Sequence, residues 1–138
     1  MKNSTKLSHV KKSFLSLVVV LLSTIVINAQ EIKLKKDKVL LGDKNIFSYK
    51  RSDMGSKFQV YTLNSNEEIL FVNLQNIPEK YGNYWKFYFP VQDKFFFKKI
   101  INSFKDELRL LFEDKVIDGE GNIDQSKLDS YIKKYNEL

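Results

Sequence analysis

The feature that most constrains this chain is the uncharged apolar run from Phe14 to Ile27, FLSLVVVLLSTIVI. Four lysines precede the run, and Asn28-Ala29-Gln30 follows it. A basic segment, a short apolar run and a small residue at the cleavage point are together typical of a secretory signal peptide. We therefore predict a signal peptide over residues 1–29, cleaved between Ala29 and Gln30, and a single exported domain over residues 30–138.

The alternative to cleavage is a membrane anchor that stays attached. A membrane-spanning helix needs roughly 20 apolar residues, whereas this run is shorter and contains Ser16, Ser23 and Thr24. We favour cleavage, so that the chain meets a membrane only through its leader before processing. The expected location is the periplasm or the extracellular space, and the sequence leaves open which of the two.

The charge balance changes once the leader is set aside. Of the 23 basic residues, Lys2, Lys6, Lys11 and Lys12 lie in the leader, so 19 basic and 17 acidic residues remain, a net charge of +2. The sequence pI of 9.3 therefore belongs largely to the leader. A nucleic-acid-binding domain is expected to carry a basic stripe, and we predict no nucleic-acid partner.

The predicted mature domain contains no cysteine, and the single histidine, His9, lies in the leader. A Ser-His or Cys-His nucleophile pair therefore cannot be built. Imidazole and thiolate ligands for zinc, copper, haem or iron–sulfur clusters are missing as well. We predict no catalytic residues, no metal site and no cofactor.

Two other kinds of site remain conceivable from carboxylates alone. The adjacent pairs Glu67-Glu68, Asp106-Glu107 and Glu113-Asp114 could act as acid and base, but they fall in expected turns or on polar helix faces. The segment Asp114–Lys127 resembles a calcium loop only loosely, because neither Gly119 nor Gly121 places oxygen ligands at the required positions. We interpret that segment as a plain helix–turn–helix connection.

The fold class that we predict is α+β. Over residues 30–99, short strand-forming segments alternate with turn residues, which indicates an antiparallel β-meander of about six strands. Over residues 100–138 the apolar residues recur at helical spacing, which indicates a helical hairpin packed on the sheet. In the segment Tyr84–Val91, the alternation of a strand assigns one set of side chains to the core: Trp85, Phe87, Phe89 and Val91. It assigns the other set to the opposite face: Tyr84, Lys86 and Tyr88.

The helix boundaries are predicted from capping residues. Ser103 and Asp106 form a possible cap near the beginning of the first helix, Gly119 and Gly121 are expected to end it, and Asp124 caps the second helix. The segment Phe95–Lys99 is either the last strand or the beginning of the first helix, and the sequence does not decide between them.

Several expected strands are apolar on both faces, for example Ile69 and Phe71 against Leu70, Val72 and Leu74. Two helices cover only one face of a sheet, so the sheet must curl on itself, pair with another molecule or leave an apolar surface open. We favour the curled sheet and keep a homodimer as an alternative.

The candidate ligand-binding residues are Tyr81, Tyr84 and Tyr88. Aromatic side chains in strands usually belong to the core, and we expect Trp85 to be buried. Tyr81 and Tyr84, however, lie on either side of Gly82 in an expected loop, where binding residues tend to collect. They could form an aromatic platform for a sugar ring, a peptide or a lipid.

The Asn-Ala-Gln junction, the meander rich in Lys, Asn, Phe and Tyr, and the closing segment Val116–Tyr135 resemble the small uncharacterised exported proteins common in Bacteroidota. The resemblance extends over the whole chain. It implies a location in the cell envelope or outside the cell, and it implies no activity and no site residues.

The leading hypothesis is a non-enzymatic exported domain that binds a ligand or protein in the envelope or outside the cell. One alternative is a carboxylate-dependent glycan hydrolase or lyase, which requires two carboxylates facing each other across a cleft beside Tyr84. The other alternative is a self-associating envelope protein that uses an apolar sheet face as its interface.

Overall fold

The computed structural model describes residues 31–138, so the predicted signal peptide and its cleavage point lie outside the described residues. Seven strands come first and two helices follow, which confirms the α+β class with one strand more than expected. The strands are β1 (Ile32–Lys35), β2 (Lys38–Leu41), β3 (Lys44–Ser52), β4 (Lys57–Thr62), β5 (Glu68–Ile77), β6 (Gly82–Phe89) and β7 (Lys94–Lys99). The helices are α2 (Phe104–Glu113) and α3 (Gln125–Tyr135).

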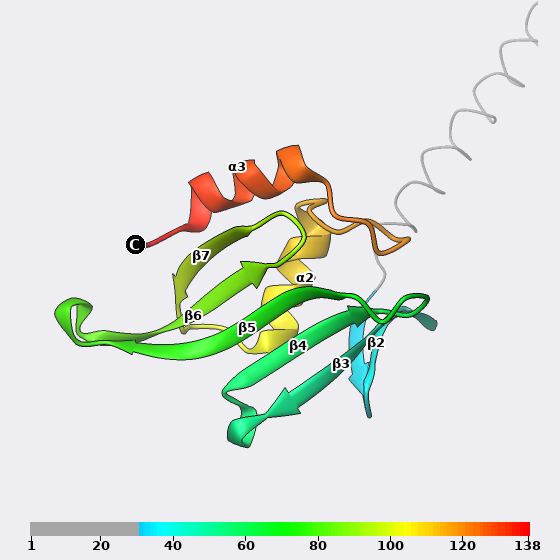
Figure 1. Ribbon diagram of the computed structural model, residues 1–138, viewed down its shortest axis with the longest axis horizontal. Helices are drawn as coiled ribbons and strands as arrows, with labels where there is room; N and C mark the ends of the chain where they lie inside the picture. The colour runs from blue at the N-terminus through cyan, green and yellow to red at the C-terminus, as the bar shows by residue number, and fades with distance from the viewer. Residues whose placement is uncertain (1–30) are drawn as a thin grey trace, which may run out of the picture. The chain divides into compact units, whose positions relative to one another are not determined.

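The sheet is a pure meander, in which each strand pairs with the next strand of the chain (Figure 1). Every pairing from β1–β2 to β6–β7 is antiparallel. The segment Phe95–Lys99, left open by the sequence, belongs to strand β7.

The connection between β5 and β6 is short, because Ile77 still pairs with Gly82 at the end of the ladder. Between them lies a single 3-10 turn, η2 (Pro78–Lys80), which begins with proline and ends at Tyr81 in a left-handed conformation with φ of 52°. Proline suits the first position of such a turn because its φ is fixed and no N–H is needed there.

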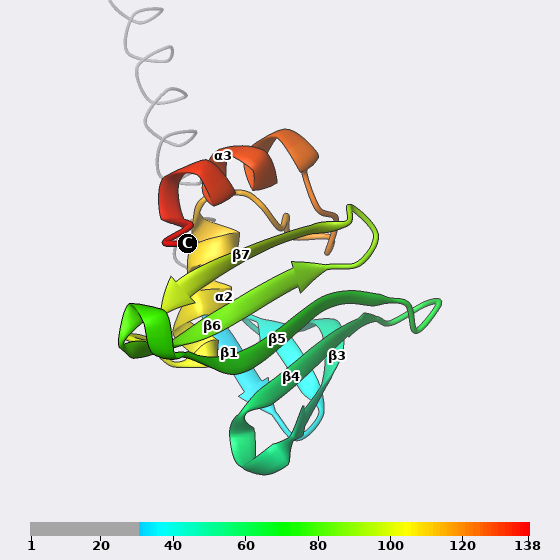
Figure 2. The same cartoon turned by 60° about the vertical axis from the view of Figure 1, so that its left-hand side comes forward.

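The two helices pack on the same face of the sheet but at different places. Helix α2 packs against β1, and α3 packs against β7. Figures 1 and 2 show β1 and β2 turning out of the plane of the other strands, so that the sheet curls around α2. The largest completely covered apolar side chains come from the sheet, the helices and the loop between the helices: Phe47, Leu70, Phe87, Phe89, Phe96, Leu108, Leu111, Ile117 and Leu128.

Strand β6 tests the predicted alternation directly. Trp85, Phe87 and Phe89 are buried in the core, as expected. Val91 does not belong to this set, because it is 56% exposed. The strand ends at Phe89, and Pro90 already lies in the turn to β7, where the alternation of a strand no longer applies.

Both helices begin where their capping residues predict. The Ser103 hydroxyl accepts a hydrogen bond from the Asp106 backbone N–H at 3.2 Å. The Asp124 carboxylate accepts one from the Lys127 N–H at 3.1 Å. Each side chain satisfies a donor that the first turn of a helix would otherwise leave unpaired.

The predicted end of the first helix is wrong. Helix α2 ends at Glu113, well before Gly119. Lys115 takes the left-handed position with φ of 62°, and its N–H donates to the Phe112 carbonyl while the Val116 N–H donates to the Leu111 carbonyl. This is the Schellman arrangement, in which glycine is the usual residue, so a lysine in that place gave no sequence signal.

Gly119 and Gly121 instead serve the loop between the helices. Gly121 has φ of +85°, and a Cβ there would lie 2.9 Å from a ring carbon of Phe47. The Asp118 carboxylate accepts hydrogen bonds at 2.9 Å from the N–H groups of Glu120 and Asn122. Partial burial pushes the pKa of Asp118 upward, but these hydrogen bonds outweigh it and lower the pKa below its ordinary value.

The free edge of β7 is covered by the C-terminal tail. The Phe97 N–H donates to the Asn136 side-chain oxygen at 3.0 Å, and the Phe97 carbonyl accepts from the Glu137 N–H at 2.9 Å. Unpaired edge groups invite pairing with another chain, and the tail removes two of them. Among residues 31–138, neither helix has the length and apolar character that a membrane crossing requires.

Candidate functional site

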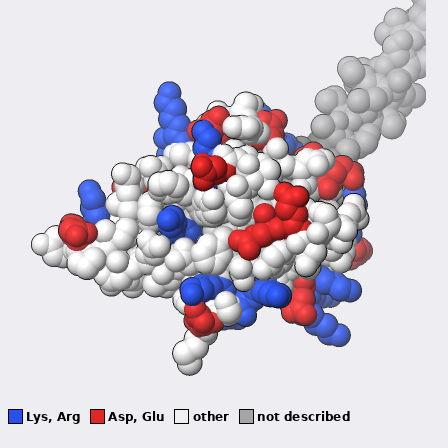
Figure 3. All heavy atoms as spheres, viewed as in Figure 1, with Lys and Arg blue, Asp and Glu red and all other residues white. Residues whose placement is uncertain are grey.

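The helices leave one surface of the sheet uncovered, and we call this surface the outer face. Its residues on β3 to β7 are those that alternate with the buried core positions. In the view of Figure 1 the sheet lies in front of α2, and Figure 3 shows that uncharged atoms make up most of the surface seen from that side. Six aromatic residues stand at outward positions: Tyr61, Phe71, Tyr84, Tyr88, Phe95 and Phe97.

The strand register places these side chains in rows that run across the strands. One row consists of Lys50, Gln59, Phe71, Tyr88 and Phe95. Neighbouring strands lie about 5 Å apart, so its last three members stand side by side on β5, β6 and β7. The strand register thus places three aromatic residues in one row of the outer face.

A second row lies beside the first and consists of Lys57, Asn73, Lys86 and Phe97. A third, shorter row consists of Gln75, Tyr84 and Lys99. Rings, amides and lysines therefore alternate over the outer face.

The rings differ in how much of their surface is accessible. Phe95 is 55% exposed, whereas Tyr84 is only 7% exposed. Tyr61, Phe71, Tyr88 and Phe97 are half-buried. Half-buried rings are held in place by their neighbours while one surface stays open, which is the condition for stacking on a ligand.

Lys86 lies among these rings. Its Nζ is 4.9 Å from the ring centroid of Phe95 and 5.8 Å from that of Phe97. The two rings meet edge to face with their centroids 6.0 Å apart. Cation–π contact of this kind fixes the ammonium group, and no carboxylate of the described residues pairs with it.

Two acidic side chains at this face are engaged by neutral donors. The Tyr88 hydroxyl donates to Asp93 at 3.1 Å, and the Gln59 amide donates to Glu68 at 3.1 Å. The hydrogen bond to Asp93, with smaller contributions from burial and from the Asp93 charge, raises the pKa of Tyr88. Burial and the nearby Glu68 charge raise the pKa of Tyr61. Both phenols therefore stay neutral at neutral pH, and the single O–H of Tyr88 is already donated to Asp93.

The three tyrosines predicted as a binding site occupy different environments. Tyr84 and Tyr88 point to the outer face from one strand, and Tyr84 lies in β6 rather than in a loop. Tyr81 ends the turn η2 and is 95% exposed. The predicted role of the three in binding stays a prediction.

The alternation of β6 correctly placed Lys86 on this surface without assigning it a role, but sequence reasoning missed Phe71, Phe95 and Phe97 as members. The available signal was the alternation of β7, where Phe96 is buried between Phe95 and Phe97. That signal could be used only if the segment was known to be a strand, and the sequence left this open.

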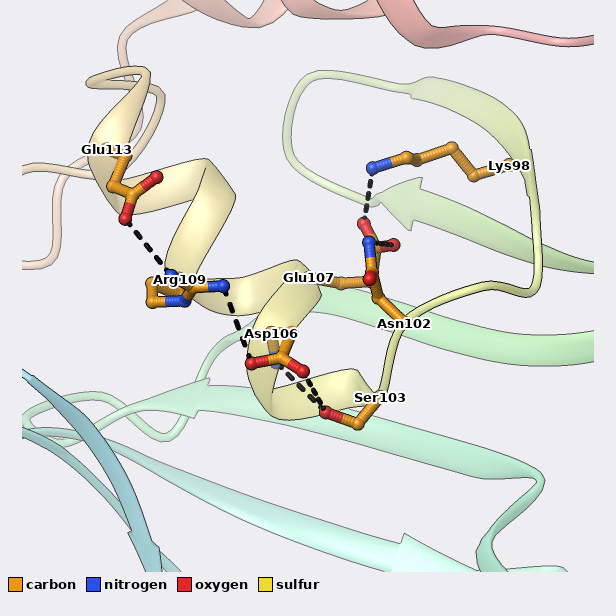
Figure 4. A network of polar contacts seen from close by, with 7 residues as sticks. All are labelled: Lys98, Asn102, Ser103, Asp106, Glu107, Arg109 and Glu113. Atoms are coloured by element: carbon orange, nitrogen blue, oxygen red, sulfur yellow. Dashed lines mark hydrogen bonds and ion pairs between the residues drawn. The ribbon is translucent and has the colours of Figure 1, made fainter.

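Of the carboxylate pairs considered in the sequence, Asp106-Glu107 is divided between two separate sets of contacts. Glu107 is completely buried, and its two oxygens bind Lys98 Nζ at 2.7 Å and the Asn102 amide at 3.3 Å (Figure 4). Asp106 turns away to Ser103 and Arg109. Within residues 31–138, no group of three or more His, Cys, Asp or Glu side chains is arranged to hold a metal ion.

An open pocket of about 200 Å³ lies beside α3, lined by Asp114, Lys127, Ser130, Tyr131 and Lys134. It is smaller than the roughly 300–1,000 Å³ of common ligand pockets. The Tyr131 hydroxyl is buried without a hydrogen-bond partner among the described residues. Burial, and the nearby charges of Glu107, Tyr135 and Asp114, raise the pKa of this phenol.

No protein-family model matches the chain, and comparison with curated proteins and with solved structures finds no match.

Proposed function

We propose that this chain is an exported, non-enzymatic domain that binds a glycan through its outer face. The observation that carries the proposal is the row of aromatic residues formed by Phe71, Tyr88 and Phe95 on an uncovered sheet surface. The signal peptide predicted from the sequence supports a ligand in the cell envelope or outside the cell.

The chemistry of the outer face favours a sugar polymer among the ligands that stack on aromatic rings. A sugar ring presents C–H groups on its faces and hydroxyls around its edge. Rings on the outer face can stack on the C–H groups of a sugar. The amides of Gln59, Asn73 and Gln75 stand between the rings and can bind the sugar hydroxyls. An open sheet surface also suits an extended polymer better than a small molecule, which prefers an enclosed pocket.

A peptide ligand would most simply add a strand to a free sheet edge. At β7 the tail residues Asn136 and Glu137 already occupy the backbone groups of Phe97. The β7 edge is therefore less suited to binding a peptide than the outer face is to binding a glycan.

A glycan microarray tests the proposal, with protein purified after expression of the full chain. The test variant is Phe95→Ser with Phe97→Ser, and the control is Ile101→Ser, which removes another exposed apolar side chain, 75% exposed, outside the sheet. We expect the wild type and the control to bind the same glycans and the double variant to lose at least tenfold in affinity. Failure to bind any glycan, or equal binding by all three proteins, overturns the proposal.

The same preparation tests export. Mass spectrometry of protein recovered from the periplasm of a bacterial host should show a chain that begins at Gln30. A chain that still begins at Met1 contradicts cleavage and the predicted location.

Self-association through the outer face is the second candidate function, favoured by the exposed rings of that surface. Sedimentation of the wild type and the Phe95→Ser, Phe97→Ser variant separates the two candidates. We expect a monomer in both cases. A wild-type dimer that the double variant abolishes would assign the outer face to self-association instead.

A further inference from the structure

We infer that the glycan bound at the outer face is an anionic polysaccharide, whose acidic groups are bound by Lys86 and its neighbouring lysines. This inference rests on the proposed function and specifies the class of ligand.

The first step of the argument is the sign of the charge on the outer face. Among the outward positions of β3 to β7 there are four lysines and one glutamate: Lys50, Lys57, Lys86, Lys99 and Glu68. Residues 31–138 as a whole carry a net charge of only +2. The Tyr88 hydroxyl also binds Asp93 at this face, so four lysines stand against two acidic groups on the surface that holds the rings.

The second step concerns what these lysines already bind. Lys57 pairs with Asp53 at 2.8 Å. Among the described residues, Lys50, Lys86 and Lys99 have no carboxylate partner. Lys50 and Lys86 lie instead over aromatic rings, at 5.8 Å from the Tyr61 centroid and 4.9 Å from the Phe95 centroid. A cation held by rings keeps its hydrogen-bond donors available to an incoming anion.

The third step is the position of the central lysine. Lys86 stands directly opposite Phe97 on one side and Asn73 on the other, and Tyr88 is the next outward residue along its own strand. An acidic sugar stacked on the rings would therefore place its charged group beside an ammonium that is already fixed. Charge-assisted hydrogen bonds are about twice as strong as neutral ones, so the charge adds selectivity to the stacking.

The same lysines argue against a second copy of the chain as the occupant. A symmetric dimer pairs a surface with itself, which would bring the lysines of both copies into one interface with only Glu68 and Asp93 of each copy to offset them. Like charges brought together in this way repel each other. An acidic polymer relieves that repulsion, whereas a second copy doubles it.

The test compares polygalacturonate with its fully methyl-esterified form, which has the same chain without the charge. Binding of each polymer is measured by calorimetry, with protein purified after expression of the full chain. The variants are Lys86→Gln, Lys86→Arg, and the control Lys105→Gln, which removes an exposed lysine on α2, away from the outer face. Thermal melts confirm that each variant is folded.

We expect polygalacturonate to bind at least about tenfold more tightly than the ester, with an affinity that falls as salt is added. Lys86→Gln should lower the affinity for polygalacturonate roughly tenfold, while Lys86→Arg and Lys105→Gln change it less than about twofold.

Three outcomes would contradict the inference that the ligand is anionic. Equal binding of both polymers, lost in the Phe95→Ser, Phe97→Ser variant but unchanged in Lys86→Gln, overturns the charge inference and leaves the proposed function standing. An equal loss in Lys86→Gln and Lys105→Gln shows unspecific attraction and also overturns it. Binding of neither polymer overturns it as well, and the microarray then decides the proposed function separately.

Two other polyanions serve as further probes. Oligothymidylate and phosphatidylglycerol vesicles carry negative charge without sugar rings of this kind. Tighter binding of either, with the same dependence on Lys86, would overturn the polysaccharide assignment in favour of a nucleic acid or a membrane surface.

Discussion

Two lysines on opposite faces of the same sheet differ in burial and in binding partner, because the helices cover only one of the faces. Lys98, on the inner face of β7, is 4% exposed and pairs with Glu107 at 2.7 Å. Lys86, on the outer face of β6, is half-buried, lies over two rings and has no carboxylate partner among the described residues. Covering one face with helices obliges its lysine to bind an acid of the same chain. The uncovered face leaves its lysine available to an acid from elsewhere.

The inner lysine is fixed from several directions. Its Nζ lies 4.6 Å from the ring centroid of Tyr135 and 5.9 Å from that of Tyr131. Asn102 binds the second oxygen of Glu107. A buried pair needs such extra contacts, because the loss of hydration on burying two charges is otherwise larger than their attraction.

Removing one member of the inner pair should have the largest effect on stability. Glu107→Ala leaves Lys98 buried without a counter-charge, and we expect a loss of about 3–5 kcal/mol in the free energy of unfolding. Urea denaturation measures it. The double variant Lys98→Met with Glu107→Leu should recover most of the loss, since apolar side chains can replace a buried pair. A loss below about 1 kcal/mol in Glu107→Ala would contradict the burial of the pair.

Two adjacent phenylalanines in β7 point to opposite faces of the sheet, so their substitution compares how much side-chain packing on each face stabilises the fold. Phe96 is completely buried and stacks on Phe87 with centroids 4.6 Å apart, whereas Phe95 is 55% exposed. We expect Phe96→Ala to lower the free energy of unfolding by about 3–5 kcal/mol and Phe95→Ala by less than about 1 kcal/mol. Thermal and urea denaturation of the two variants measure the difference. Similar losses would mean that both faces are covered.

An exposed carboxylate bound by backbone groups gives an intermediate case. Asp118→Ala removes the acceptor for two N–H groups, and we expect a loss of about 1 kcal/mol in the free energy of unfolding at pH 7. The folded pKa of Asp118 is lowered from 3.8, so its stabilisation is complete above that pH and disappears as pH falls through the lowered value. Denaturation of the wild type and the variant from pH 7 to pH 2 should therefore show the difference shrinking below about pH 4. A difference that grows in acid would contradict the hydrogen bonds of this loop.

The outer lysine should contribute least to stability. Lys86→Gln loses only its cation–π contacts, and we expect a change of about 0.5 kcal/mol or less in the free energy of unfolding. Differential scanning calorimetry of the wild type and Lys86→Gln checks it, with Lys105→Gln as the control. A loss near that of Glu107→Ala would show that Lys86 serves the fold, and the contrast between the two faces would fail.

The sequence predicts the fold better than it predicts the surface. The alternation of Trp85, Phe87 and Phe89 and the capping residues Ser103 and Asp124 were sufficient for a meander followed by two helices, because each is a local signal. The end of α2 was missed because Lys115 takes a conformation that glycine usually takes.

The outer face could not be assembled from the sequence because its rows depend on strand register. Phe71, Tyr88 and Phe95 are separated in the chain and become neighbours only through the β5–β6 and β6–β7 pairings. Of the three predicted tyrosines, Tyr84 and Tyr88 lie on the outer face, but the alternation alone could not show that Phe71 and Phe95 lie beside Tyr88. Composition cannot supply that information, since the same residue types fill the core.

The meander also has a consequence for the order of assembly. Every strand pairs with its immediate successor, so the sheet can form by closing short loops one after another. Closing short loops is a rapid step of folding. Docking of α2 onto β1 joins segments from opposite ends of the domain and should come late. The ring centroids of Trp85 and Phe58 lie 6.0 Å apart, and Phe58 stacks on Phe104 of α2. The indole fluorescence of this single tryptophan should therefore report when α2 packs against the sheet during folding.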